Sequence, residues 1–83
     1  MSTYYRPRTP LKLDDVRKLK EFDVVKDGKD WGFQSKDSFL SVETNSKGFV
    51  IDVYRHGANN VDDIFPHIKD RLGVSFISEE ETN

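Results

Sequence analysis

Two turn signals, each lying between segments of alternating apolar and polar residues, constrain the fold more than any other feature. Asp27-Gly28 separates residues 22–26 from 29–34, and Asn45-Ser46-Lys47-Gly48 separates residues 39–44 from 49–55. Such turns are typical of β-hairpins, because glycine and asparagine tolerate the positive φ values that tight reversals need. The segment from residue 22 to residue 55 is therefore predicted to form an antiparallel four-stranded β-meander.

Each hairpin predicts a register, and each register divides the side chains between two faces. A two-residue turn at Asp27-Gly28 pairs Val24 with Trp31 and directs both toward the core. A four-residue loop in the second hairpin pairs Val42 with Ile51 on the same core face. The opposite face of the second hairpin then presents the side chains of Phe39, Ser41, Glu43, Val50, Asp52 and Tyr54.

Helical patterns flank the meander. A short N-terminal helix is expected from Asp14, as its cap, to about Phe22. A C-terminal amphipathic helix is predicted over about 61–72, with Asn60 as its cap and Gly73 at its end. Pro66 favours a regular start near residue 63, because proline is tolerated only in a first turn. A short final strand follows at 74–78, and the fold class is a small single-domain α+β protein.

The two ends of the chain differ in charge. The whole chain has 13 Lys and Arg against 15 Asp and Glu, but residues 1–20 contain six basic and two acidic side chains. Residues 1–10 are expected to form a flexible basic and aromatic arm, because Pro7 and Pro10 withhold hydrogen-bond donors. The single α+β domain is assigned to residues 11–78, and residues 79–83 are expected to form an acidic tail.

Composition excludes several classes of function. The 83 residues include no cysteine, which excludes disulfides and thiolate zinc sites. No segment approaches the roughly 20 apolar residues of a membrane span, and residues 1–10 are not typical of a secretory signal. We therefore expect a cytoplasmic protein that does not associate with a membrane. Phosphate-binding glycine loops and serine nucleophile elbows are absent. No metal and no cofactor are predicted, and the oligomeric state is left open.

The outer face of the second hairpin suggests protein binding. An apolar and aromatic patch with a charged rim is common at interfaces, provided that the arm or the first helix does not cover it. We therefore predict a small non-catalytic interaction module or inhibitor that binds a larger protein, of a kind common in phages and mobile elements. The residues assigned to this site are Phe39, Val50, Asp52, Tyr54, Asp62 and Asp63.

Nucleic-acid binding through the basic arm is the alternative. Aromatic and cationic side chains interleave there, and such groups stack on bases and neutralise phosphates. The order of elements also resembles the double-stranded-RNA-binding domain, although that family presents lysines at the start of its last helix, where this chain has two aspartates. The residues assigned to this alternative are Tyr4, Tyr5, Arg6, Arg8, Lys12, Arg17 and Lys18.

A third motif suggests catalysis. Arg55-His56-Gly57 resembles the signature of histidine phosphatases, in which the histidine takes the phosphoryl group and the arginine holds it. That family needs a second histidine and further arginines around the phosphate, and His67 is the only other histidine here. We therefore expect that the protein is not an enzyme.

Overall fold

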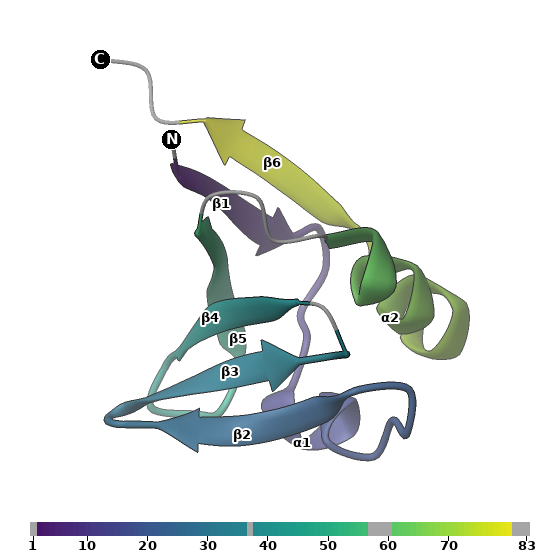
Figure 1. Cartoon of the computed structure of the whole chain (residues 1–83), viewed down its shortest axis with the longest axis horizontal. Helices are drawn as coiled ribbons and strands as arrows, with labels where there is room; N and C mark the ends of the chain where they lie inside the picture. The colour runs from purple at the N-terminus through teal and green to yellow at the C-terminus, as the bar shows by residue number, and fades with distance from the viewer. Residues whose placement is uncertain (1, 37, 57–60, 81–83) are drawn as a thin grey trace.

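The computed structural model describes residues 2–36, 38–56 and 61–80. All strands in this part of the chain join one antiparallel sheet in the order β2-β3-β4-β5-β1-β6 (Figure 1). The α+β class is confirmed, and β2 to β5 form an antiparallel meander, but the sheet has six strands because β1 and β6 are added at the edge of β5. The elements are β1 (Ser2–Pro7), α1 (Leu13–Val16), β2 (Asp23–Asp27), β3 (Asp30–Gln34), β4 (Phe39–Thr44), β5 (Val50–His56), the 3-10 turn η1 (Val61–Asp63), α2 (Phe65–Leu72) and β6 (Phe76–Glu80).

The N-terminal segment is a strand in the interior of the sheet. β1 pairs with β5 on one side and with β6 on the other, so Tyr4 lies opposite both Tyr54 and Glu79. Thr3 is buried and Tyr5 packs against the core, whereas Arg6 is exposed. A central strand therefore replaces the expected flexible arm over residues 2–7, because its backbone groups bond to two neighbours. The expected acidic tail likewise begins inside β6, and residues 81–83 lie outside the described part.

The first hairpin differs from its predicted register by two residues. Asp27 pairs with Asp30, so the turn consists of Gly28 and Lys29. Only Gly28 has a positive φ, 62°, which is typical of a type II′ turn, whereas the predicted turn required two such residues. A shift of two residues preserves the faces of a strand, so Trp31 stays on the core face, where it is half-buried.

The second hairpin contains a β-bulge that the sequence analysis missed. Glu43 pairs with Asp52, but its neighbour Thr44 pairs with Val50, so Ile51 is an extra residue in β5. Because the extra residue reverses the alternation of side chains, Val50 and Val53 both point into the core. The assignment of Val50 to the outer face was therefore wrong. The turn at 45–48 is confirmed, with Gly48 at a φ of 85°.

Both helices are shorter than predicted. α2 begins at Phe65, with Pro66 in its first turn, and η1 covers the start of the predicted segment. Gly73 ends α2 as expected, with a φ of 70° and its N–H bonded to the Lys69 carbonyl. α1 has four residues and Asp14 lies within it, so the predicted cap and the predicted end near Phe22 were wrong. Asn60 lies outside the described residues.

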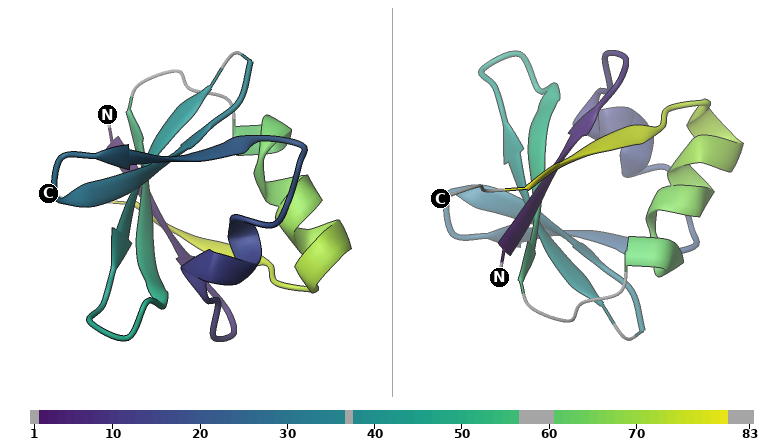
Figure 2. Two further views of the ribbon diagram at one scale, coloured as in Figure 1. Left: turned by 90° about the horizontal axis from the view of Figure 1, so that it is seen from below. Right: turned by 90° about the horizontal axis from the view of Figure 1, so that it is seen from above.

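The core lies on one side of the sheet. Figure 2 shows both helices on one side of the sheet. Side chains from both helices pack in one hydrophobic cluster with side chains of the strands. Ile64 and Ile68, beside and within α2, are fully buried, and Val16 of α1 is buried with them. Their sheet partners in the core are Phe33, Leu40, Val42, Val50 and Val53. The helices therefore cover only one face of the six strands.

An ion pair joins the segment before β2 to α2. The Nε of Arg71 donates a hydrogen bond of 2.8 Å to Oε1 of Glu21, whose side chain is 19% exposed. The pKa of Glu21 is lowered, chiefly because its carboxylate accepts a hydrogen bond from its own backbone N–H. Arg71 lowers the pKa further, and together these effects outweigh burial, which raises it. The charged form of Glu21 therefore stabilises this junction.

We expect Ile68→Ala to lower the free energy of unfolding by about 2–5 kcal/mol, because it leaves a cavity in the core. Ile77→Ala is the matched control. Ile77 is 41% exposed, so its truncation is expected to cost less than about 1 kcal/mol. Urea unfolding of both variants measures the difference. Equal losses would contradict the assignment of α2 to the core.

We expect Glu21→Gln to lower stability near neutral pH and to have a decreasing effect in acid. Because the pKa of Glu21 is lowered in the folded state, its contribution is present above the ordinary carboxyl pKa. That contribution disappears as the pH falls through the lowered pKa, where wild type and variant converge. Urea midpoints of both proteins at about pH 7 and about pH 3 test this. A difference that stays constant with pH would contradict it.

Candidate protein-binding surface

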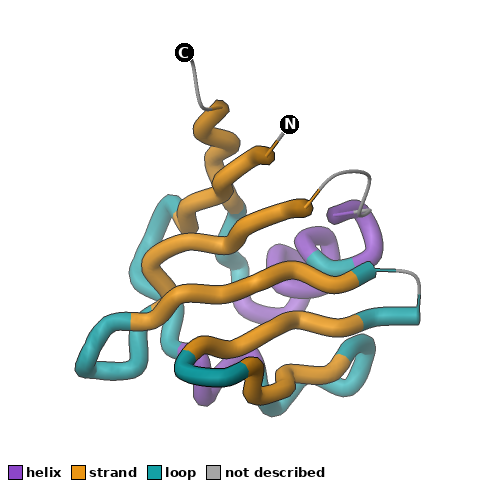
Figure 3. Tube along the Cα trace, turned by 60° about the vertical axis from the view of Figure 1, so that its left-hand side comes forward, coloured by secondary structure: helices purple, strands orange, loops and turns teal. Residues whose placement is uncertain are grey.

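The outer face of the sheet is free of helices. Figure 3 shows the strands in front and both helices behind them, and no described helix crosses the front. Phe39 of β4 is half-buried on this face, because its ring lies over Gly32 of β3, where a Cβ would overlap it. Among the described residues, the helices therefore cover the core face of the sheet and leave its outer face without a helix.

Aromatic side chains occupy the middle of this outer face. Tyr4 and Tyr54 lie opposite each other in β1 and β5, with ring centroids 4.6 Å apart. The ring of His56 meets Tyr54 edge-on at 4.2 Å, and its Nε2 lies 3.1 Å from Oγ of Ser41. Each of these side chains is fixed by a neighbour, so the centre of the face is an ordered aromatic surface.

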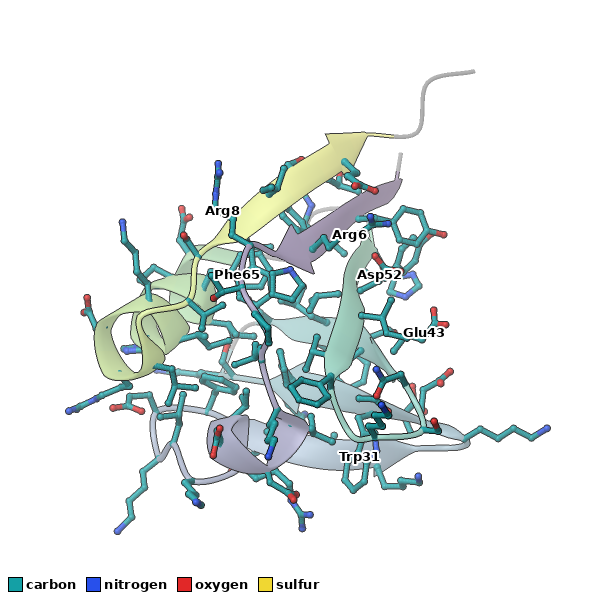
Figure 4. All side chains as sticks on the ribbon, turned by 180° about the vertical axis from the view of Figure 1, so that it is seen from behind. Arg6, Arg8, Trp31, Glu43, Asp52 and Phe65 are labelled. Carbon is teal, nitrogen blue, oxygen red and sulfur yellow. The ribbon has the colours of Figure 1, made fainter. Side chains whose placement is uncertain are left out.

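A row of carboxylates borders the aromatic centre. Asp27 lies opposite Asp30 across β2 and β3, and Glu43 lies opposite Asp52 across β4 and β5. Arg6 lies at the end of this row, with its Nε 3.6 Å from Oδ1 of Asp52. Figure 4 shows Glu43, Asp52 and Arg6 along one side of the molecule. Like charges directly opposite each other destabilise a sheet. We therefore expect the row to lower the stability of the isolated protein, less so at Asp52, which is paired with Arg6.

A small hollow lies between the acidic row and the tyrosines. Its volume is about 150 Å³. Ligand sites for small molecules usually measure about 300–1,000 Å³, so this hollow has room for one side chain at most. Three carboxylates and two aromatic rings dominate its lining, which comprises Tyr4, Asp30, Ser41, Val42, Glu43, Asp52 and Tyr54.

The structure brings together only part of the predicted protein-binding set. Phe39, Asp52 and Tyr54 share the outer face, as predicted. Asp62 and Asp63 lie in η1; Asp63 accepts a hydrogen bond of 3.4 Å from Oγ of Ser38, and Asp62 lines a different concavity. These two aspartates are therefore separate from the aromatic centre.

The residues of the nucleic-acid alternative are dispersed. Tyr4 faces outward, whereas Tyr5 faces the helices and contacts Phe65 at 4.9 Å. Arg17 and Lys18 each pair with an aspartate of α1, and Arg17 also lies over the Trp31 ring. The remaining members are Arg6 in the acidic row, Lys12 over the Phe49 ring, and Arg8, which is exposed.

The residues of the catalytic motif point in opposite directions. His56 lies on the outer face, whereas Arg55 is opposite Leu40 and Thr3 on the core face. Adjacent residues of a strand alternate in this way, so the two side chains do not converge on one phosphate. Among the described residues, no group of three or more histidine and carboxylate side chains is arranged to hold a metal ion.

A second concavity opens between η1, α2 and β6. It measures about 400 Å³, and the rings of Phe65 and Phe76 stack in its wall at 4.3 Å. Asp62 and Lys69 are the charged residues of its lining. The groove therefore combines a stacked aromatic wall with one acidic and one basic side chain.

Sequence reasoning missed several members of the outer face. Asp27 was predicted only as a turn residue, Asp30 was placed in a strand without a role, and Tyr4 and Arg6 were assigned to an arm. Thr3, Tyr4 and Tyr5 are residue types enriched in strands, and this run was the signal that could have revealed β1.

Comparisons with known proteins add no family to this description. No protein-family model, no curated protein and no solved structure matches the chain. Neither helix of the described chain has the length and apolar character that a membrane crossing requires.

We expect Glu43→Gln to raise the free energy of unfolding by about 0.2–1 kcal/mol, because it removes one of two facing carboxylates. The gain should shrink in high salt, which screens exposed charges. Asp23→Asn is the control, since Asp23 lies opposite the neutral Gln34 and should change little. Urea unfolding at low and high salt compares them. Destabilisation by Glu43→Gln at low salt would contradict this reading.

Proposed function

We propose that this protein is a small non-catalytic interaction module that binds a larger protein through the outer face of its sheet. The observation that supports this most is the aromatic centre formed by Tyr4 and Tyr54 on a face that no described helix covers. Tyrosines are enriched at the energetic centres of interfaces, because they combine a large apolar ring with a hydrogen-bonding group.

The acidic row supports the same proposal from a different direction. Facing carboxylates oppose folding, so a sequence optimised only for stability would not place Glu43 opposite Asp52 or Asp27 opposite Asp30. Departures from local consistency are expected at functional surfaces. Charged borders also accelerate association with an oppositely charged partner.

The two alternatives have less support. The basic residues of the nucleic-acid alternative lie on different surfaces, and Arg6, Arg17 and Lys18 already pair with carboxylates. The enzyme alternative needs Arg55 and His56 on one side of the sheet, and they occupy opposite sides.

A cross-linking experiment tests the proposal. A photoreactive amino acid at Ser41, in the outer face, captures the partner in cells of the source organism, and the same group at Asp70 of α2 is the control position. The captured protein is then purified, and its dissociation constant is measured by calorimetry. We expect Tyr54→Ala to weaken binding by roughly 30-fold or more, the size of an interface hot spot.

Asp70→Ala is the control variant and should bind like wild type, because Asp70 is exposed on the helix side. Circular dichroism and urea unfolding are used to check that Tyr54→Ala is folded before its binding is compared with that of wild type. Capture from Asp70 but not from Ser41 would contradict the proposal. So would a partner that binds Tyr54→Ala and Phe39→Ala as tightly as wild type.

A further inference from the structure

We propose that the hollow on the outer face receives an arginine side chain of the partner protein. This inference rests on the proposed function and specifies the chemistry of its site. The hollow has a volume of about 150 Å³, comparable to an engineered cavity that holds one benzene molecule. Its size therefore suits the end of a single side chain.

The lining of the hollow matches a guanidinium group. Asp30, Glu43 and Asp52 supply carboxylates from three neighbouring strands, and Tyr4 and Tyr54 supply aromatic faces. A planar guanidinium bonds to carboxylates with two parallel N–H groups and stacks on aromatic rings at the same time. Lysine presents a compact, strongly hydrated charge and makes only part of these contacts, so arginine is the better occupant.

The protein's own Arg6 shows how a guanidinium lies at this border. Its Nε is 3.6 Å from Oδ1 of Asp52, and its terminal nitrogen is 3.4 Å from Oε2 of Glu79. Arg6 itself is not part of the lining of the hollow, and its side chain is 55% exposed. Among the described residues, Asp30 and Glu43 make no ion pair, so two carboxylates of the hollow remain available to a cation of the partner.

The facing carboxylates also provide a reason for tight binding of a cation. Glu43 lies opposite Asp52, which Arg6 neutralises only from one side, and a guanidinium placed between the row and the tyrosines would offset the repulsion expected between facing carboxylates. The acidic row and the Arg6–Glu79 pair beside it contain one guanidinium, that of Arg6, and five carboxylates, those of Asp27, Asp30, Glu43, Asp52 and Glu79. The charge of this border therefore favours a basic partner over an acidic or neutral one.

A peptide titration followed by NMR tests the inference without a known partner. The probe is the capped tripeptide acetyl-Gly-Arg-Gly-amide, and the same peptides with lysine and with glutamine are the comparisons. We expect saturable amide shifts confined to the lining of the hollow. The dissociation constant for the arginine peptide should be lower than for the glutamine peptide by about tenfold, which corresponds to about 1.4 kcal/mol.

Two variants localise the effect. Asp30→Asn/Glu43→Gln removes two carboxylates of the hollow and should abolish the preference for arginine over glutamine. Asp23→Asn removes a carboxylate elsewhere on β2 and should leave that preference unchanged. Added salt should weaken the arginine peptide more than the glutamine peptide.

The outcomes separate this inference from the proposed function. Equal binding of the three peptides, shifts spread over the whole surface, or an unchanged preference in the double variant would each overturn the inference. So would a lysine peptide that binds as tightly as arginine. A partner whose affinity depends on Tyr54 but not on Asp30 and Glu43 would support the proposed function and still overturn the arginine site.

Discussion

The two hydrogen-bonded ladders of β1 connect the parts of this structure. On one side β1 continues the meander through β5, and on the other it provides the only described pairing for β6. Because α2 leads directly into β6, this pairing also holds the helix against the core. The same strand places Tyr4 next to Tyr54, so the aromatic centre of the outer face depends on the pairing that completes the sheet.

The sequence was sufficient to predict several features that depend on neighbours along the chain. The presence of the two hairpins, the turn at 45–48 and the end of α2 at Gly73 follow from local chemistry, namely glycine at positive φ and helical spacing. The registers of both hairpins differ from the predicted ones, since the first turn lies one residue later and Val42 pairs with Val53 instead of Ile51. β1 was missed because its partners lie far along the chain and because Pro7 suggested irregular structure. A proline is tolerated at the end of a strand, where its missing donor interrupts little of the ladder.

The candidate site was predicted in part for the same reason. Tyr54, Asp52 and Phe39 followed from simple alternation within the second hairpin. Val50 did not, because one extra residue at Ile51 turns it inward, and bulges have no strong signature in a single sequence. The acidic row spans β2 to β5 and becomes visible only when the registers of several hairpins are combined.

The position of β1 has a consequence for how the chain folds. Tyr4 pairs with residues 50 and 75 positions later, whereas the hairpins join residues close in sequence. Contacts between distant residues form late, because closing a long loop costs more entropy than closing a short one. During synthesis β1 emerges before both of its neighbours, so it cannot enter the sheet until β5 has followed, and its second edge stays unpaired until β6 is made. A strand that is made early is thus built into the sheet late, and its free edge is open to strands of other molecules until β6 covers it.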